Sequence, residues 1–130
     1  MKIEFTTDNI KPGTYLAEVV SASETESKAG NPMIELCLNL EMGGGKKRVH
    51  YDRLTVAYPP KIKAFLEASG MLDQWEKKEI DARTCVGKVV KAVFEEARSN
   101  YAKEKGLLAE LETYQSSGKP TPKPLDDIPF

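Results

Sequence analysis

The chain has 130 residues, 40% hydrophobic and 30% charged, with a formal net charge of -1 from 19 basic and 20 acidic residues. This length fits one domain with its own core plus an extension, without metal or disulfide support. The longest apolar runs are far short of the roughly 20 residues that span a bilayer, and residues 1–5 lack the apolar region of a secretory signal. Composition therefore argues against a membrane partner. Two isolated cysteines, Cys37 and Cys85, favour a reducing cytoplasm.

Three strands are predicted in the first half of the chain. Residues 14–23 are apolar and β-branched and follow a Pro-Gly turn signal. After a loop of turn formers at 27–32, residues 33–42 alternate with period two, which is typical of a half-buried strand. Three glycines at 43–45 form a turn, so residues 46–57 are predicted to be the hairpin partner of this strand.

A helix is expected after the third strand. Pro59-Pro60 suits a first helical turn, and Gly70 lies where a helix C-terminus is expected. Between them, Ile62, Phe65 and Leu66 fall on one helical face. This face is predicted to pack on the core.

The remaining segments supply two more strands. We interpret residues 1–11 as an N-terminal arm, 71–83 as charged and irregular, 85–96 as a strand, and 97–106 as a polar loop. Residues 107–115 are ambiguous, because local propensity favours a helix while alternation allows a strand. We choose a strand, because the strand at 85–96 needs a partner and tertiary pairing often overrides propensity.

The order of elements predicts the fold class. Three strands, a helix and two strands match a five-stranded OB-type barrel, all-β apart from one helix between strands three and four. We assign this domain to residues 1–115. Residues 116–124 carry prolines at alternate positions, which favours an extended spacer. We expect residues 116–130 to form a flexible tail outside the core.

No catalytic constellation is visible. His50 is the only histidine, which excludes a His-paired metal site within one chain, and we interpret it as a surface or strand residue without chemistry. The glycines at 43–45 are followed by basic residues and no helix, unlike a P-loop. We therefore expect a non-enzymatic protein that needs no metal and no cofactor.

A basic stripe, defined as residues 46–63, is the first candidate binding feature. Six basic residues are opposed there only by Asp52, which leaves a local charge of +5. OB folds bind along strands two and three and through two flanking loops, and rings interleaved with cations suit single-stranded nucleic acid. The alternative is that Tyr51 packs in the sheet and the charges are merely solvated. The predicted DNA-binding residues are Lys28 and Asn31 in the first flanking loop, Lys47, Arg48, Tyr51 and Arg53 on strand three, Tyr58 beyond it, and Arg98, Tyr101 and Lys103 in the second flanking loop.

The chain's last residues form a second candidate site. The predicted protein-interaction tip consists of Asp126, Asp127, Ile128, Pro129 and Phe130. A partner could take the terminal ring into an apolar pocket, pair its carboxylate with Arg or Lys, and meet the aspartates with a basic rim. Proline before the last residue lowers the entropic cost of docking.

Both candidate sites are strengthened by resemblance. The tip resembles that of bacterial single-stranded-DNA-binding proteins, which typically ends Asp-Asp-Asp-Ile-Pro-Phe. The body is similar to a phage-type family of small single-stranded-DNA-binding OB proteins at Ile10-Lys11-Pro12-Gly13-Thr14-Tyr15, at Ser27-Lys28-Ala29-Gly30-Asn31-Pro32-Met33 and at Phe65-Leu66-Glu67-Ala68-Ser69-Gly70. The resemblance implies a protein that protects single-stranded DNA without sequence specificity in the bacterial host cytoplasm. It also implies that the tip recruits replication, recombination and repair enzymes.

Two other functions remain open at this point. An RNA-binding OB module would show the same rings and cations. An adaptor that mimics the tip, with a barrel that binds no nucleic acid, fits the net charge of -1. The sequence leaves a monomer and a homo-oligomer equally open.

Overall fold

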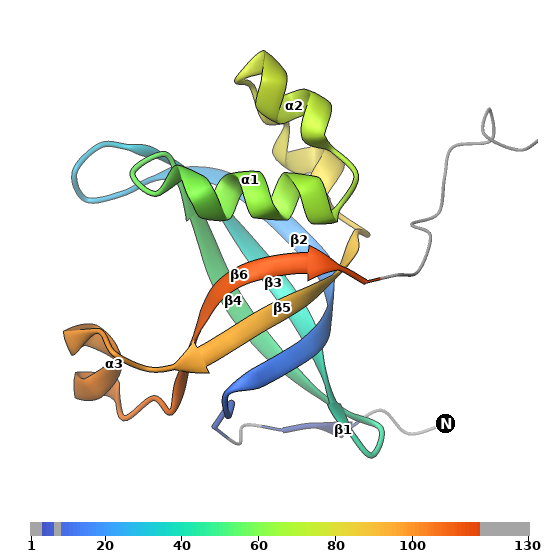
Figure 1. Cartoon of the computed structure of the whole chain (residues 1–130), viewed down its shortest axis with the longest axis vertical. Coiled ribbons are helices and arrows are strands. Elements are labelled where there is room, and N and C mark those ends of the chain that lie inside the picture. Colours follow the sequence, from blue (N-terminus) through green and yellow to red (C-terminus); the bar gives the residue numbers. More distant parts are fainter. Residues whose placement is uncertain (1–3, 7–8, 118–130) are drawn as a thin grey trace, which may run out of the picture.

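The structure, a computed structural model, describes residues 4–6 and 9–117 and is built on one six-stranded sheet of order β1-β4-β3-β2-β5-β6 (Figure 1). Only the pairing of β1 with β4 is parallel; the others are antiparallel. Among the described residues the sheet does not close by strand pairing, so β1 and β6 are its edges. The strands are β1 (Glu4–Phe5), β2 (Gly13–Glu26), β3 (Pro32–Gly43), β4 (Lys46–Thr55), β5 (Val89–Glu96) and β6 (Ala109–Ser116).

The core lies on the concave face of this sheet, and β3 shows why. Its alternation buries Ile34, Leu36, Leu38 and Leu40, so the predicted period of two is confirmed. Neighbouring strands and helix α1 (Pro59–Ala68) add apolar side chains to the same core. The strand predicted at 107–115 is confirmed as β6, which pairs antiparallel with β5.

Helix α1 lies where the sequence placed it, between β4 and β5. It begins with its two prolines and buries Ile62, Phe65 and Leu66. The chain leaves the helix through Gly70, whose φ of 76° is readily adopted only by glycine. The helix packs against β6, β4 and β5 and lies across one end of the curved sheet (Figure 1).

The expectation of a single helix was wrong. Helix α2 (Leu72–Lys77) and the 3₁₀ helix η1 (Ala82–Cys85) occupy the segment interpreted as irregular, and α3 (Asn100–Lys105) occupies the polar loop. Each is too short for a clear apolar repeat, so its signal lies in its ends. In α3 the Ser99 side chain accepts a hydrogen bond from the Ala102 amide, and Gly106 ends the helix at a φ of 69°.

Several strand boundaries also differ from prediction: β2 runs on to Glu26 rather than to residue 23, β4 ends at Thr55 rather than at residue 57, and β6 begins at Ala109 rather than at residue 107. β5 begins at Val89 rather than at Cys85, because Cys85 is the last residue of η1 and Gly87 turns the chain at a φ of 87°. The segment interpreted as an arm contributes β1, whose two residues add a sixth strand beside β4. The Thr6 amide extends this pairing with a 2.9 Å hydrogen bond to the Lys47 carbonyl.

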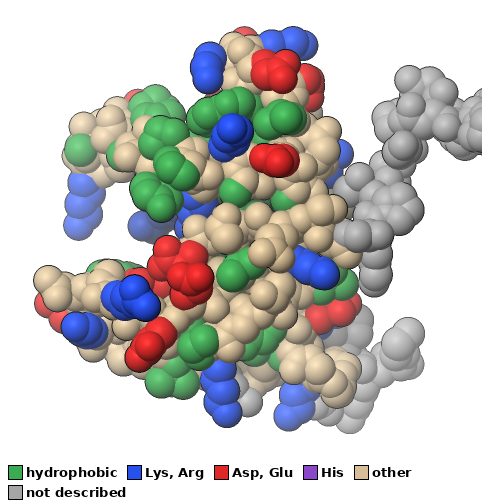
Figure 2. Space-filling model, in the orientation of Figure 1, with side chains coloured by type: hydrophobic (Ala, Val, Ile, Leu, Met, Phe, Trp, Pro, Cys, Tyr) green, Lys and Arg blue, Asp and Glu red, His purple; other side chains and the backbone are tan. Residues whose placement is uncertain are grey.

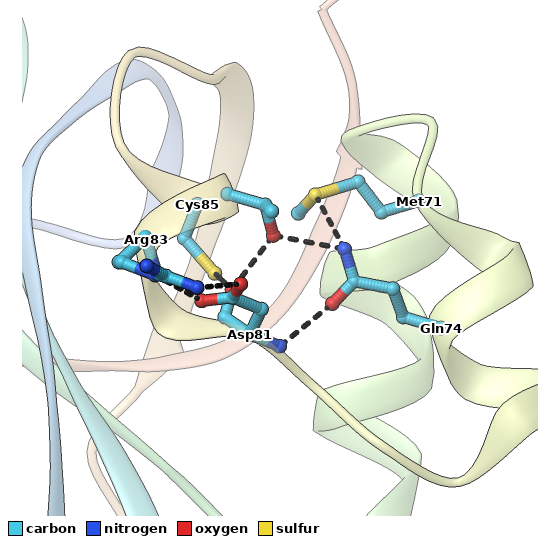
Figure 3. A network of polar contacts seen from close by, with 6 residues as sticks. Met71, Gln74, Asp81, Arg83 and Cys85 are labelled. Carbon is cyan, nitrogen blue, oxygen red and sulfur yellow. Dashed lines mark hydrogen bonds and ion pairs between the residues drawn. The ribbon is translucent and has the colours of Figure 1, made fainter.

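A polar network fixes α2 against η1 (Figure 3). The Gln74 side chain accepts a hydrogen bond from the Asp81 amide at 2.9 Å and donates one to the Thr84 hydroxyl at 2.8 Å. Asp81 in turn accepts from the Arg83 side chain at 3.1 and 3.0 Å. These contacts hold the segment that follows α1 by joining α2 to η1.

Side chains join β4 to β6, two strands between which the described residues form no backbone pairing. The buried carboxylate of Asp52 on β4 accepts hydrogen bonds from the Tyr114 hydroxyl on β6 and from the Lys61 ammonium on α1, the latter at 2.6 Å. We call these three residues the Asp52 clasp. The Tyr114 ring also meets Phe65 edge-on at 5.1 Å between centroids. The clasp therefore links β4, α1 and β6.

Candidate nucleic-acid interface

Strand β4 presents two different faces. Leu36, Leu38 and Leu40 are buried, and their register partners Asp52, His50 and Arg48 therefore face inward as well. The alternate residues of β4 face outward, on the convex side of the sheet. They are Lys47, Val49, Tyr51 and Arg53.

The inward position of Arg48 separates it from the rest of the predicted interface. Its Nη1 atom donates to the Val49 carbonyl at 2.8 Å, and its charge lies close enough to His50 to lower the pKa of that imidazole. Burial is the larger cause of the lowered pKa of His50, and Asp52 opposes it. The histidine packs edge-on against Phe94 at 5.2 Å, so it belongs to the inward face of the sheet.

The basic stripe does not form one positive surface. Its Lys61 is held by Asp52 in the clasp, and Arg53 pairs with Glu35 of β3 at 3.2 Å. Lys47 stands opposite Glu41 in the β3–β4 register. Carboxylates of β3 thus balance the cations of β4 on the outward face, and net charge does not distinguish this surface.

Exposed aromatic rings do distinguish it. Tyr51 is 62% exposed on the outward face, and a hydrogen bond with the neighbouring Cys37 side chain raises the pKa of this phenol. Phe5 is 60% exposed and pairs with Lys47, which places it on the same face. Sequence reasoning missed Phe5, whose only signal was an aromatic ring in a short polar arm. The alternative in which Tyr51 packs within the sheet does not fit its exposure.

The first flanking loop closes at the end of β4. Ser27 and Asn31 hold it through a hydrogen bond from the Ser27 amide to the Asn31 carbonyl and another from the Asn31 amide to the Ser27 hydroxyl, at 2.9 and 3.1 Å. Asn31 is half-buried, whereas Lys28 is exposed at the loop's tip. Tyr58, at the start of α1, is 53% exposed next to this end of the sheet.

The second flanking loop carries α3. Arg98, Tyr101 and Lys103 are all exposed there, and Tyr101 is 64% exposed. The β2–β3 loop and α3 project on the same side in Figure 1. The space-filling view shows a recess between these two lobes, with basic side chains on both (Figure 2).

A separate hollow of about 570 Å³ opens between the β2–β3 hairpin, the start of α1 and the segment after α2. Its apolar lining includes Ile34, Ile62 and Ile80, while Glu24 and Glu79 also line it. Carboxylates beside the opening repel phosphate, so this hollow is a poor place for nucleic acid. The convex face of β4 is the better candidate.

The described residues carry two further findings. No group of three or more His, Cys, Asp or Glu side chains there could hold a metal ion. None of the helices in that part of the chain has the length and apolarity needed to cross a membrane. The predicted tip, Asp126 to Phe130, lies outside the described residues.

The comparisons place the chain in a family. A family model described as a protein of unknown function (DUF669) matches residues 2–124, and the chain belongs to this family. No curated protein matches the chain. The family assignment covers the sheet, the helices and the proline-rich segment 116–124, but its description assigns no activity.

Proposed function

We propose that the described domain is an OB-type barrel that binds single-stranded DNA without sequence preference, and that it is not an enzyme. The antiparallel order β4-β3-β2-β5-β6 agrees with an OB fold, as does the position of α1 between the third and fourth of these strands. The Asp52 clasp takes the place of backbone pairing between β4 and β6. β1 is then an addition to the edge of the barrel.

The exposed ring of Tyr51 carries the proposal. It stands on the outward face of β4, and exposed cations are available in the β2–β3 loop at Lys28 and in the loop of α3 at Arg98 and Lys103. Stacking on such rings tolerates any base, because every base has a π-face. The loop cations supply phosphate contacts, while the paired charges of β3 and β4 limit their number. We therefore expect binding that depends on stacking more than on salt.

A titration with labelled oligo(dT) and with duplex DNA over a range of salt tests the proposal. We expect a preference for the single strand that weakens only gently as salt rises. Tyr51→Ala should weaken binding about five-fold or more, since one base–ring stack contributes about 1–3 kcal/mol. Tyr51→Phe keeps the ring and should bind like the wild type.

Lys91→Ala serves as the control, because Lys91 is exposed on β5, away from β4. Equal affinity for single-stranded and duplex DNA, or unchanged binding by Tyr51→Ala, would contradict the proposal. A matched oligo(rU) tests the RNA alternative: tighter binding to RNA than to DNA would favour it.

The sequence beyond residue 117 adds a recruiting role. We propose that the tip, Asp126 to Phe130, binds replication, recombination and repair proteins and so concentrates them on the bound DNA. The balanced charges on β3 and β4 favour one competing function, an adaptor whose barrel binds no nucleic acid. The absence of any oligo(dT) binding together with intact partner binding would favour the adaptor.

A further inference from the structure

We infer that Phe5 and Tyr51 form one two-ring platform for bases of a single strand, with the first ring supplied by β1. The inference rests on the proposed function and extends it to a segment that the basic stripe does not include. β1 is attached to the exposed edge of β4 by the pairs Glu4–Lys46 and Phe5–Lys47. Its position at that edge broadens the outward face beyond the five strands of the barrel.

The register brings the two rings to one face. Lys47 and Tyr51 are both outward-facing residues of β4, and Phe5 takes the side of its partner Lys47. Four residues of strand separate Lys47 from Tyr51, or about 13 Å at about 3.3 Å per residue. One base cannot bridge that distance. The platform therefore takes two bases of the same strand, with Val49 on the surface between them.

Packing in the core does not explain why a phenylalanine stands at position 5. Its ring is 60% exposed and is not part of the core cluster, although phenylalanine is usually buried. Tyr51 is 62% exposed, so both rings are accessible to a ligand lying along β4. A base stacked on Phe5 would remove apolar surface from water that the fold leaves exposed.

One cation lies beside the platform. Lys47 is half-buried on the outward face and pairs with Phe5, whereas Lys46, one residue earlier in β4, alternates to the opposite face. A strand crossing from Tyr51 to Phe5 would bring a phosphate to the Lys47 ammonium. Glu41 stands opposite Lys47 in the β3–β4 register and balances its charge, so the rings rather than the cation carry the platform.

Affinity for oligo(dT) measured with Phe5→Ala, Phe5→Leu and Phe5→Tyr tests the inference. The platform predicts a loss of about five-fold or more for alanine, since this is the effect of one stacked base. Leucine keeps an apolar side chain without a ring and should lose nearly as much, whereas tyrosine should bind like the wild type. Val86→Ala removes exposed apolar surface at the end of η1 and should change nothing.

A spectroscopic probe tests the platform even if Phe5→Ala weakens the pairing of β1 with β4. Phe5→Trp places an indole on the platform, and its emission, after subtraction of the Trp75 signal of the wild type, should be quenched by oligo(dT). Unchanged affinity in Phe5→Ala, or unquenched emission from the indole of Phe5→Trp, overturns the platform. If Tyr51→Ala loses affinity in the same assay, the proposed function survives that failure. If the wild type binds no oligo(dT), both fall together.

Discussion

Asp52 joins three elements of the fold through one buried carboxylate. It was the one carboxylate within the basic stripe, and it is buried with two partners on different elements. The Tyr114 phenol that donates to it has a pKa well above its usual value, chiefly because of burial and then because of the Asp52 charge. Within the described part of the chain, no buried side-chain nitrogen or oxygen lacks a hydrogen-bond partner. The clasp is therefore costly to break at any one point.

Removing the Asp52 charge should destabilise the domain strongly. Asp52→Asn would leave the Lys61 side chain, which is 15% exposed, without its counter-ion, and breaking such a largely buried ion pair costs up to about 3–5 kcal/mol. Tyr114→Phe removes only the phenol's hydrogen bond to Asp52 and should cost about 1–3 kcal/mol. Urea unfolding monitored by circular dichroism measures both losses.

The control for the clasp is Glu35→Gln, because Glu35 and Arg53 form an exposed ion pair worth about 0–1 kcal/mol. A loss for Asp52→Asn no larger than the loss for Glu35→Gln would show that the clasp does not hold the sheet together.

His50 should make the stability depend on pH. Its folded pKa lies below the usual 6.5, so the unfolded chain binds the proton more tightly. The free energy of unfolding should therefore fall as the pH drops below about 7, by at most about 1.4 kcal/mol per pH unit. It is the only histidine, so His50→Gln should flatten the curve between about pH 7 and 5.5. Equal slopes in the two proteins would contradict this.

At the scale of elements, the alternation of apolar residues in β3 allowed more to be predicted than the existence of that strand. Because one face of β3 is wholly apolar, its orientation was predictable, and so were the hairpin with β4 and the position of α1. Short elements were not predictable, since β1, α2, η1 and α3 have two to six residues and too few apolar positions for a period. They depend on caps and on tertiary contacts instead.

The residues of the candidate interface could be predicted only in part, because β4 lacks the apolar alternation that β3 has. Along β4, neither alternate set is apolar: one contains Lys47 and Tyr51, the other Arg48 and Asp52. The sequence of β4 could not say which set faces the core, and only its register with β3 turns Tyr51 outward and Arg48 inward. Charge counted along a strand therefore overestimated the charge on either face.

The charge balance between β3 and β4 leads to a prediction about salt. Glu35→Gln should release Arg53 to contact a phosphate, which tightens binding to oligo(dT) at low salt. One additional phosphate contact steepens the plot of log affinity against log salt by about 0.7. Glu76→Gln makes the same charge change on the exposed face of α2 and should leave the slope unaltered. A slope unchanged by Glu35→Gln would place Arg53 outside the DNA path.

At the scale of the whole molecule, the net charge of -1 hides an uneven distribution along the chain. Exposed cations lie at Lys46 at the start of β4 and in the two loops, at Lys28, Arg98 and Lys103, while two aspartates stand among the last five residues. The formal charges of Asp126 and Asp127 oppose those cations. Attraction between these aspartates and cations would make the tip compete with DNA for the same surface, weakly and only at low salt.

Deleting residues 125–130 should therefore separate the two proposed roles. The deletion removes two negative charges and changes the formal net charge from -1 to +1. Oligo(dT) affinity at low salt should stay equal or rise, with the difference vanishing as salt increases. Recovery of replication and repair proteins from a bacterial extract on the immobilised protein should be lost.

Phe130→Ala is the matched control for this deletion, because it keeps both aspartates and removes only the ring. It should lose partner recovery as the deletion does, yet bind oligo(dT) like the full chain, since no charge has changed. A fall in DNA affinity on deletion would mean that residues 125–130 contribute to the DNA site itself. In that case the described domain and the tip could not be assigned separate functions.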